Sequence, residues 1–102
     1  MSVKHLNLES FEEIKNEKIA LVDFYADWCG PCRMLAPVIE EIAGERPDIT
    51  VAKVNVDDAP EIARKFGIVS IPTVIIFKGG EIAKRVTGVR PKAQLLSLID
   101  EA

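Results

Sequence analysis

The segment Ile19–Ala26 is apolar at almost every position, and it constrains the fold more than any other part of the sequence. A strand with one exposed face alternates apolar and polar residues, whereas a strand covered on both faces is apolar throughout. The segment that follows, Pro31–Gly44, repeats its apolar residues with the 3.6-residue period of a helix. A buried strand followed directly by a helix predicts an α/β fold, with helices on both faces of a sheet.

The rest of the chain divides into short elements of the same kind. They are, in chain order, a strand at Val3–Leu6, a helix from Ser10, a strand at Thr50–Val56, a short helix from Asp58 to about Gly67, strands at Thr73–Phe77 and Glu81–Val86, and a last helix opened by Pro91. Two of the helix starts rest on capping-box spacing, Ser10 with Glu13 and Asp58 with Glu61. Helical crossovers are expected to keep the early strands parallel, and Gly79-Gly80 predicts an antiparallel hairpin. We therefore expect a mixed sheet of about five strands flanked by about four helices.

Length and charge exclude several classes of protein. At 102 residues, the chain is expected to form one domain over residues 1–102, with a core that needs no disulfide to fold. A net charge of −3 provides no broad basic surface for nucleic acid. The longest apolar runs, such as Val74–Phe77, are far shorter than the roughly 20 residues that span a bilayer. Met1–Asn7 has no basic stretch before an apolar core, so we expect a cytoplasmic protein without membrane or nucleic-acid partners.

The chain has two cysteines, Cys29 and Cys32, and both lie at the predicted junction between strand and helix. A structural disulfide is unusual in a reducing compartment. With the single His5, the two cysteines provide at most three soft ligands, whereas a structural zinc site needs four, so no metal site is expected. Two incidental core cysteines are the alternative, because free cysteine is often buried. Their position at the end of a central strand favours redox catalysis instead.

Their spacing gives the two thiols different roles. Three residues apart at a helix start, they lie on the same side of the first turn, so a disulfide between them can open and close without unfolding the domain. Cys29 lies at or before this turn, where N–H groups and the helix dipole favour a thiolate, and is expected to attack a partner's disulfide. Cys32 is expected to be more buried and to release the reduced partner by attacking Cys29. Gly30 permits close approach of another chain, and Pro31 suits the first turn.

The run Val22–Pro37, VDFYADWCGPCRMLAP, closely resembles the thioredoxin family, and so does Gly67–Thr73, GIVSIPT. The likeness covers essentially the whole chain, and Trp-Cys-Gly-Pro-Cys is specific to the thioredoxins proper. It implies a thioredoxin fold and a monomeric dithiol electron carrier that reduces disulfides in cytosolic client proteins. It also implies re-reduction by a thioredoxin reductase and no bound cofactor. The chain has no Gly-x-Gly-x-x-Gly nucleotide motif, which agrees with that last expectation.

Asp23 is the one charged residue of the predicted strand Ile19–Ala26, and Lys53 is the one charged residue of the predicted strand Thr50–Val56. Asp23 stands in the apolar strand, where burial raises the pKa of a carboxyl group. It is expected to accept a proton from Cys32 through water, the alternative being a carboxylate that reaches a donor at the strand end. From its strand alone, Lys53 is interpreted as a solvated lysine. The resemblance favours function for both, because thioredoxins have a buried aspartate and a lysine whose amine approaches it at the matching positions.

Four more residues are expected to bind substrate around Cys29. Trp28, the only tryptophan, precedes it in a loop and is expected to be a half-exposed contact, with a lid packed on its own domain as the alternative. X-Pro bonds are trans by default, but the resemblance implies a cis Ile71–Pro72 bond packed against the cysteines. Pro72 has no N–H, which leaves Ile71 to pair with an extended substrate. Gly88 matches a thioredoxin glycine near this patch, with an ordinary loop glycine as the alternative.

Tyr25 departs from the family, which often has tryptophan at this position, and only packing is expected to change.

Two other functions stay open. One is a disulfide isomerase or oxidase of the same fold, which the Gly-Pro spacer disfavours and a redox titration would distinguish. The other is a module that binds through Trp28, Ile71 and Gly88 without turnover. Disulfide reduction that is abolished by Cys29→Ser would exclude such a module.

Overall fold

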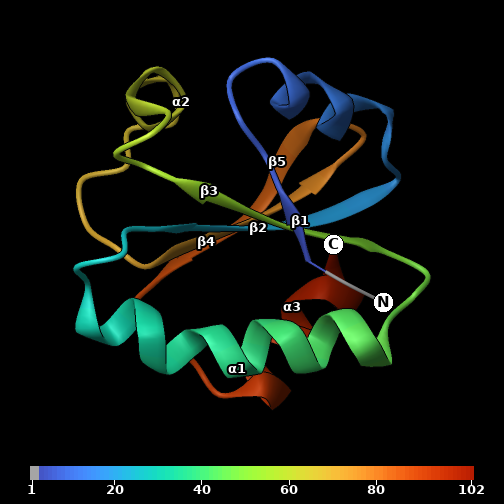
Figure 1. Cartoon of the computed structure of the whole chain (residues 1–102). Helices are drawn as coiled ribbons and strands as arrows, with labels where there is room; N and C mark the ends of the chain where they lie inside the picture. Colours follow the sequence, from blue (N-terminus) through green and yellow to red (C-terminus); the bar gives the residue numbers. More distant parts are fainter. Residues whose placement is uncertain (1–2) are drawn as a thin grey trace.

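Strand β2 (Ile19–Tyr25) lies in the middle of the sheet, as its continuous apolar sequence predicts. The computed structural model describes residues 3–102, so the first two residues of the expected domain lie outside it (Figure 1). Within these residues the other elements are β1 (Lys4–His5), the 3-10 helix η1 (Ser10–Asn16), α1 (Gly30–Glu45), β3 (Thr50–Asn55), α2 (Pro60–Lys65), β4 (Thr73–Lys78), β5 (Glu81–Thr87) and α3 (Lys92–Glu101). The expected five strands and four helical segments are thus confirmed for the described part of the chain.

The sheet is mixed, in the order β1-β3-β2-β4-β5. Strands β1 and β2 both run parallel to β3, as predicted. Strand β4 runs antiparallel to β2, so the antiparallel part of the sheet reaches its centre and is not confined to the β4–β5 hairpin. Strand β3 ends at Asn55, beside Tyr25, and β4 begins at Thr73, beside Phe24. The connection that contains α2 therefore starts and ends at the same edge of the sheet, and β4 runs back along β2.

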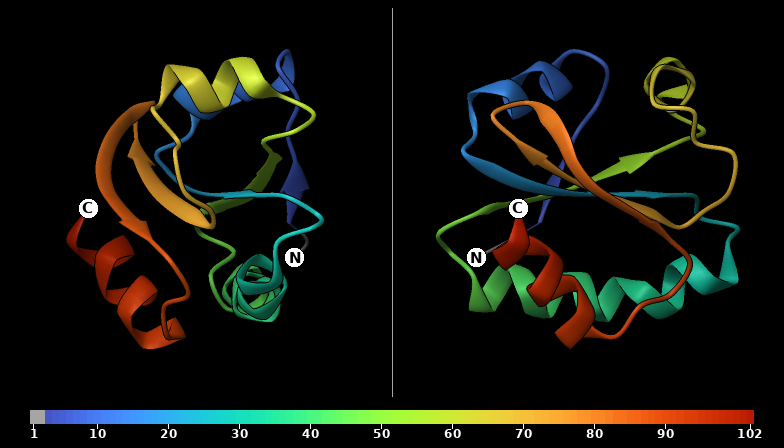
Figure 2. Two further views of the ribbon diagram at one scale, coloured as in Figure 1. Left: turned by 90° about the vertical axis from the view of Figure 1, so that its left-hand side faces the viewer. Right: turned by 180° about the vertical axis from the view of Figure 1, so that it is seen from behind.

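Helices cover both faces of the sheet (Figure 1). In both views of Figure 2, η1 and α2 lie above the sheet, and α1 and α3 lie below it. Alternate residues of β2 enter the two cores, since Val22 and Phe24 pack on the η1–α2 side and Leu21 packs on the α1–α3 side. Asp23 therefore points to the same side as Leu21, under α1.

The two predicted capping boxes do not form, because an asparagine caps each turn instead. At η1, Asn7 Oδ1 accepts a hydrogen bond from the Ser10 N–H at 2.8 Å, and Ser10 Oγ accepts one from the Asn7 N–H at 2.9 Å. Before α2, Asn55 Oδ1 accepts a hydrogen bond from the Asp57 N–H at 2.9 Å, and the N-cap is Ala59. Asparagine stabilises such turns by bonding to backbone a few residues along the chain.

The β4–β5 turn packs against η1 at Gly80, which has a φ of +86°. A Cβ atom there would lie 2.7 Å from the Cα of Lys15. We expect Gly80→Ala to lower the free energy of unfolding by roughly 1–3 kcal/mol. Gly44→Ala is the matched control, because this helical site is open and alanine should stabilise it by about 0.5–1 kcal/mol. Urea unfolding measures both, and a Gly80→Ala protein as stable as Gly44→Ala would contradict the packing argument.

Candidate active site

The loop after β2 places both cysteines at the carboxyl end of that strand. Cys29 is the N-cap of α1, and Cys32 lies in its first turn. Their Cα atoms are 5.2 Å apart, and a disulfide joins them. The Cys32 N–H donates a hydrogen bond to Cys29 Sγ at 3.2 Å. An N–H at a helix start that is aimed at this sulfur favours a negative charge on it.

The expected difference in burial between the two cysteines is slight in this oxidised protein. Cys29 is 4% exposed and Cys32 is 3% exposed. Both belong to a cluster with Ala26, against which Tyr25, Val56 and Ile71 pack. The Ile71 carbonyl oxygen lies 3.9 Å from Cys29 Sγ, so the loop before β4 covers this sulfur. Cys32 is one of the buried residues of α1. What distinguishes the two sulfurs is their position on the helix and the hydrogen bond from the Cys32 N–H, which Cys29 Sγ accepts.

Trp28 extends from the protein beside Cys29 and is 69% exposed. Its indole Nε1 donates a hydrogen bond to Asp57 Oδ2 at 2.8 Å. The ring is therefore held at its polar edge and does not cover its own domain as a lid. Sequence reasoning missed Asp57, although the parallel strands β2 and β3 end at the same edge of the sheet. That shared edge brings together the residues that follow the two strands.

The loop before β4 presents backbone groups next to Cys29. The Ile71–Pro72 bond is cis, as the family resemblance implies. Within residues 3–102, no backbone hydrogen bond engages the Ile71 N–H. Gly88, which has a φ of +85°, donates its N–H to the Pro72 carbonyl at 2.8 Å. This left-handed conformation favours glycine. The hydrogen bond to Pro72 ties Gly88 to the loop before β4.

Other residues expected to bind substrate surround the same point. Gly30 is half-buried at the start of α1, and Pro31 next to it is exposed. Two exposed apolar side chains lie near Ile71. They are Val69, two residues before Ile71, and Val89, which follows Gly88. Exposed apolar groups gathered beside a reactive disulfide provide a contact surface for another protein.

Asp23 is completely buried under α1. Among the described residues, neither of its carboxylate oxygens has a hydrogen-bond partner. Burial raises its pKa from 3.8 to about 7, and the positive charge of Lys53 opposes part of that rise. Lys53 is the register neighbour of Asp23 on β3. An unpaired buried carboxyl group costs stability, and such groups concentrate where they take part in chemistry.

Lys53 is half-buried and approaches Asp23 without forming an ion pair with it in the described part of the chain. Its Nζ lies 4.3 Å from the centroid of the Tyr25 ring. A pocket of about 260 Å³ opens beside it, lined by His5, Leu6, Asn7, Tyr25, Lys53, Asn55 and Asp58. Lys53 is thus in reach of solvent through this pocket and is also the strand neighbour of Asp23. The contact with Tyr25 is a second feature that sequence reasoning missed.

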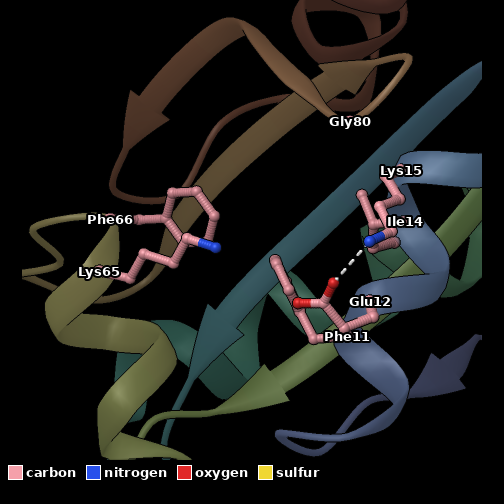
Figure 3. Close-up of a pocket in the computed structure, with 7 residues that line it drawn as sticks. All are labelled: Phe11, Glu12, Ile14, Lys15, Lys65, Phe66 and Gly80. Atoms are coloured by element: carbon pink, nitrogen blue, oxygen red, sulfur yellow. Dashed lines mark hydrogen bonds and ion pairs between the residues drawn. The ribbon is translucent and has the colours of Figure 1, made fainter.

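A second pocket, of about 120 Å³, lies between η1 and α2 on the other face of the sheet (Figure 3). Phe11 and Phe66 contribute to its wall. At its rim the Lys15 ammonium and the Glu12 carboxylate pair with each other at 2.9 Å. It contains none of the residues expected at the cysteine pair, so it lies outside the candidate site.

Two kinds of feature are absent from residues 3–102. No three side chains of His, Cys, Asp or Glu gather there as the ligands of a metal ion would. No helix there is long and apolar enough to cross a membrane.

Comparisons with known proteins agree with this geometry. The family model described as Thioredoxin matches residues 2–101. A thioredoxin of Alicyclobacillus acidocaldarius subsp. acidocaldarius is 56% identical over 85 residues, which cover 82% of this chain and 81% of that protein. The bifunctional thioredoxin reductase/thioredoxin of Mycobacterium leprae (strain TN) is 57% identical over 84 residues, 81% of this chain and 18% of that protein. A solved mutant thioredoxin from Halobacterium salinarum NRC-1 superposes with a TM-score of 0.91 at 35% identity, covering 98% of this chain and 89% of that one.

The pKa of Asp23 predicts a pH-dependent stability. The unfolded chain releases this proton near its ordinary pKa of 3.8, whereas the folded protein retains it to about 7. Between these values the folded state binds more protons, so the free energy of unfolding falls as pH rises from about 4 to 7, by up to roughly 4 kcal/mol. Asp23→Asn should remove that fall and be the more stable protein above pH 7.

The measurement is urea unfolding of the oxidised protein between pH 4 and 8. Asp27→Asn is the control, because Asp27 is an exposed aspartate in the loop that follows β2. It should retain the fall seen in the unsubstituted protein. Parallel curves for Asp23→Asn and the unsubstituted protein would contradict the argument.

Proposed function

Because this chain belongs to the thioredoxin family, we propose that it works as a dithiol electron carrier in which Cys29 attacks a client and Cys32 releases it. The chain is a thiol-disulfide oxidoreductase with protein-disulfide reductase activity. One observation supports the proposed roles above all others. It is a disulfide in which one sulfur, that of Cys29, caps the helix to which the other belongs.

In the proposed reaction, the Cys29 thiolate of the reduced protein attacks one sulfur of a client disulfide. A bond forms between Cys29 and that sulfur, and the other client sulfur leaves as a thiolate and takes up a proton. Asp23 then removes the proton from Cys32, through water, and the Cys32 thiolate attacks Cys29 Sγ. The disulfide of the chain closes, the second client sulfur leaves, and two electrons have passed to the client.

The groups around Cys29 support binding of an extended client segment. A client strand would pair with the Ile71 backbone, whose N–H has no backbone partner in the described residues. Trp28 supplies an exposed aromatic contact, Pro31 is exposed, and open space lies where a side chain at Gly30 would project. Pro72 itself is buried, and the hydrogen bond from the Gly88 N–H to its carbonyl holds the loop that carries Ile71.

A reductase is the partner that this cycle requires, because each turnover leaves the chain oxidised. The relative from Mycobacterium leprae supports it, since its printed name joins a thioredoxin reductase and a thioredoxin in one protein. We propose that a thioredoxin reductase restores the dithiol of this chain, which acts as a monomer on disulfide-containing clients in the cytoplasm. Neither a membrane nor a nucleic acid takes part in this cycle.

Serine substitutions test the two sulfur roles. Cys29→Ser should abolish reduction of a protein disulfide by chemically reduced protein. Cys32→Ser should retain the attack but not the release, so it should accumulate mixed disulfides with clients, visible by non-reducing electrophoresis. Dithiothreitol, the control, should release the trapped clients. If Cys32→Ser turned over like the unsubstituted protein, the two roles would have been assigned wrongly.

Lys53→Met tests the link between Lys53 and Asp23. Loss of the positive charge should raise the pKa of Asp23, so the pH of half-maximal disulfide reduction should move upward by roughly one unit. Lys65→Met is the matched control, because Lys65 also lies over an aromatic ring, that of Phe66, but on α2. An unchanged pH profile for Lys53→Met would show that Lys53 is only a solvated side chain.

A further inference from the structure

The ring of Tyr25 lies between the two parts of the proposed machinery. Tyr25 is the last residue of β2 and, two positions after Asp23, it points to the same face of the sheet. On one side its ring packs against the cluster of Cys29 and Cys32. On the other side it contacts Lys53, whose Nζ lies 4.3 Å from the ring centroid.

Lys53 has little else to fix its position. In the described part of the chain its ammonium makes no ion pair and no hydrogen bond to a side chain, and a lysine stem is flexible. The pocket beside it also contains Asp58, an exposed carboxylate on the solvent side. An ammonium that turned toward Asp58 would remain hydrated and would leave Asp23. A contact must therefore keep the Lys53 ammonium on the side of the pocket nearer to Asp23.

An aromatic face attracts a cation within about 6 Å of its centroid, and more strongly where water is partly excluded. The Tyr25 ring meets both conditions, because it is half-buried and close to Nζ. Burial raises the pKa of Tyr25, and the negative charges of Asp27, Asp58 and Asp23 raise it further, while a hydrogen bond with Asn55 opposes part of that rise. The ring therefore stays a neutral phenol over the working range of pH.

The groups that face Asp23 leave Lys53 as its positive neighbour. On β4, the register partner of Asp23 is the apolar Val74, and the buried residues of α3 are apolar too. The cysteine pair at the start of α1 is joined as a disulfide and carries no charge in the oxidised protein. On β1, His5 stands beside Lys53 in the register and lines the same pocket. A residue that changes the protonation of Asp23 from the side of β3 must therefore act through Lys53.

We propose that Tyr25 is a positioning residue, whose ring holds the Lys53 ammonium beside the buried Asp23 carboxylate and so tunes the transfer of a proton from Cys32. The last part rests on the proposed function, in which Asp23 is the proton acceptor. The hold on Lys53 is independent of it. Tyr25 therefore does more at this position than fill the space of a larger ring.

The test follows the carboxyl ¹³C signal of Asp23 against pH in the oxidised protein. Tyr25→Leu should raise the Asp23 midpoint by roughly half a unit, because Lys53 is released. Tyr25→Phe keeps the ring and should retain the original midpoint. In a Lys53→Met background, Tyr25→Leu should add no further shift. A ring that only packs would not produce this dependence on Lys53.

Three results would overturn the proposal. They are an unchanged midpoint in Tyr25→Leu, an equal shift in the Lys53→Met background, and a Tyr25→Phe protein that behaves like Tyr25→Leu. Tyr25→Met provides a second ring-free variant should Tyr25→Leu fail to fold. The pH profile of disulfide reduction is measured in parallel. If the Asp23 midpoint moves as expected while that profile does not, the hold on Lys53 is supported and the proposed role of Asp23 is overturned.

Discussion

The burial of β2 on both faces is the constraint on which the rest of this structure depends. It requires a layer of helices on each side, and the chain supplies them as η1 with α2 and α1 with α3. Because α1 follows β2 directly, the start of this helix lies at the carboxyl end of the central strand. Both sulfurs, the exposed Trp28 and the loop at Ile71 meet there. The reactive site is thus a consequence of the way in which the core is closed.

The same burial makes Asp23 unfavourable for the stability of the fold and gives it the raised pKa on which its proposed role depends. A carboxyl group in the middle of this strand is cut off from water and, in the described residues, has no hydrogen-bond partner. The fold is less stable for it, yet the pKa of about 7 suits the proposed role of Asp23, a group that gains and loses a proton near neutral pH. Stability and proposed catalysis therefore depend on this residue in opposite directions, and Lys53 and Tyr25 lie where they can adjust the balance.

The sequence predicts the parts of this molecule that local patterns encode. The apolar run of β2, the helical period after it and the Gly79-Gly80 turn determine most elements. The position of Cys29 at the start of α1 follows from them. Pairings between distant segments were not predictable in this way, and they include the Trp28–Asp57 hydrogen bond and the Lys53–Tyr25 contact. The direction of β4 was also missed, because it depends on whether the connection from β3 crosses the sheet and not on the pattern of β4 itself.

The hydrogen bond from the Cys32 N–H to Cys29 Sγ has a further consequence. Most helices are capped by an oxygen that does not change during the life of the protein. Here the acceptor is a sulfur that, in the proposed cycle, is in turn a thiolate, a mixed disulfide and an internal disulfide. The first turn of α1, the longest helix among residues 3–102, is therefore bound to an atom whose charge alternates with every transfer of electrons. The amide of Cys32 senses that change at the reacting atom, within the backbone itself.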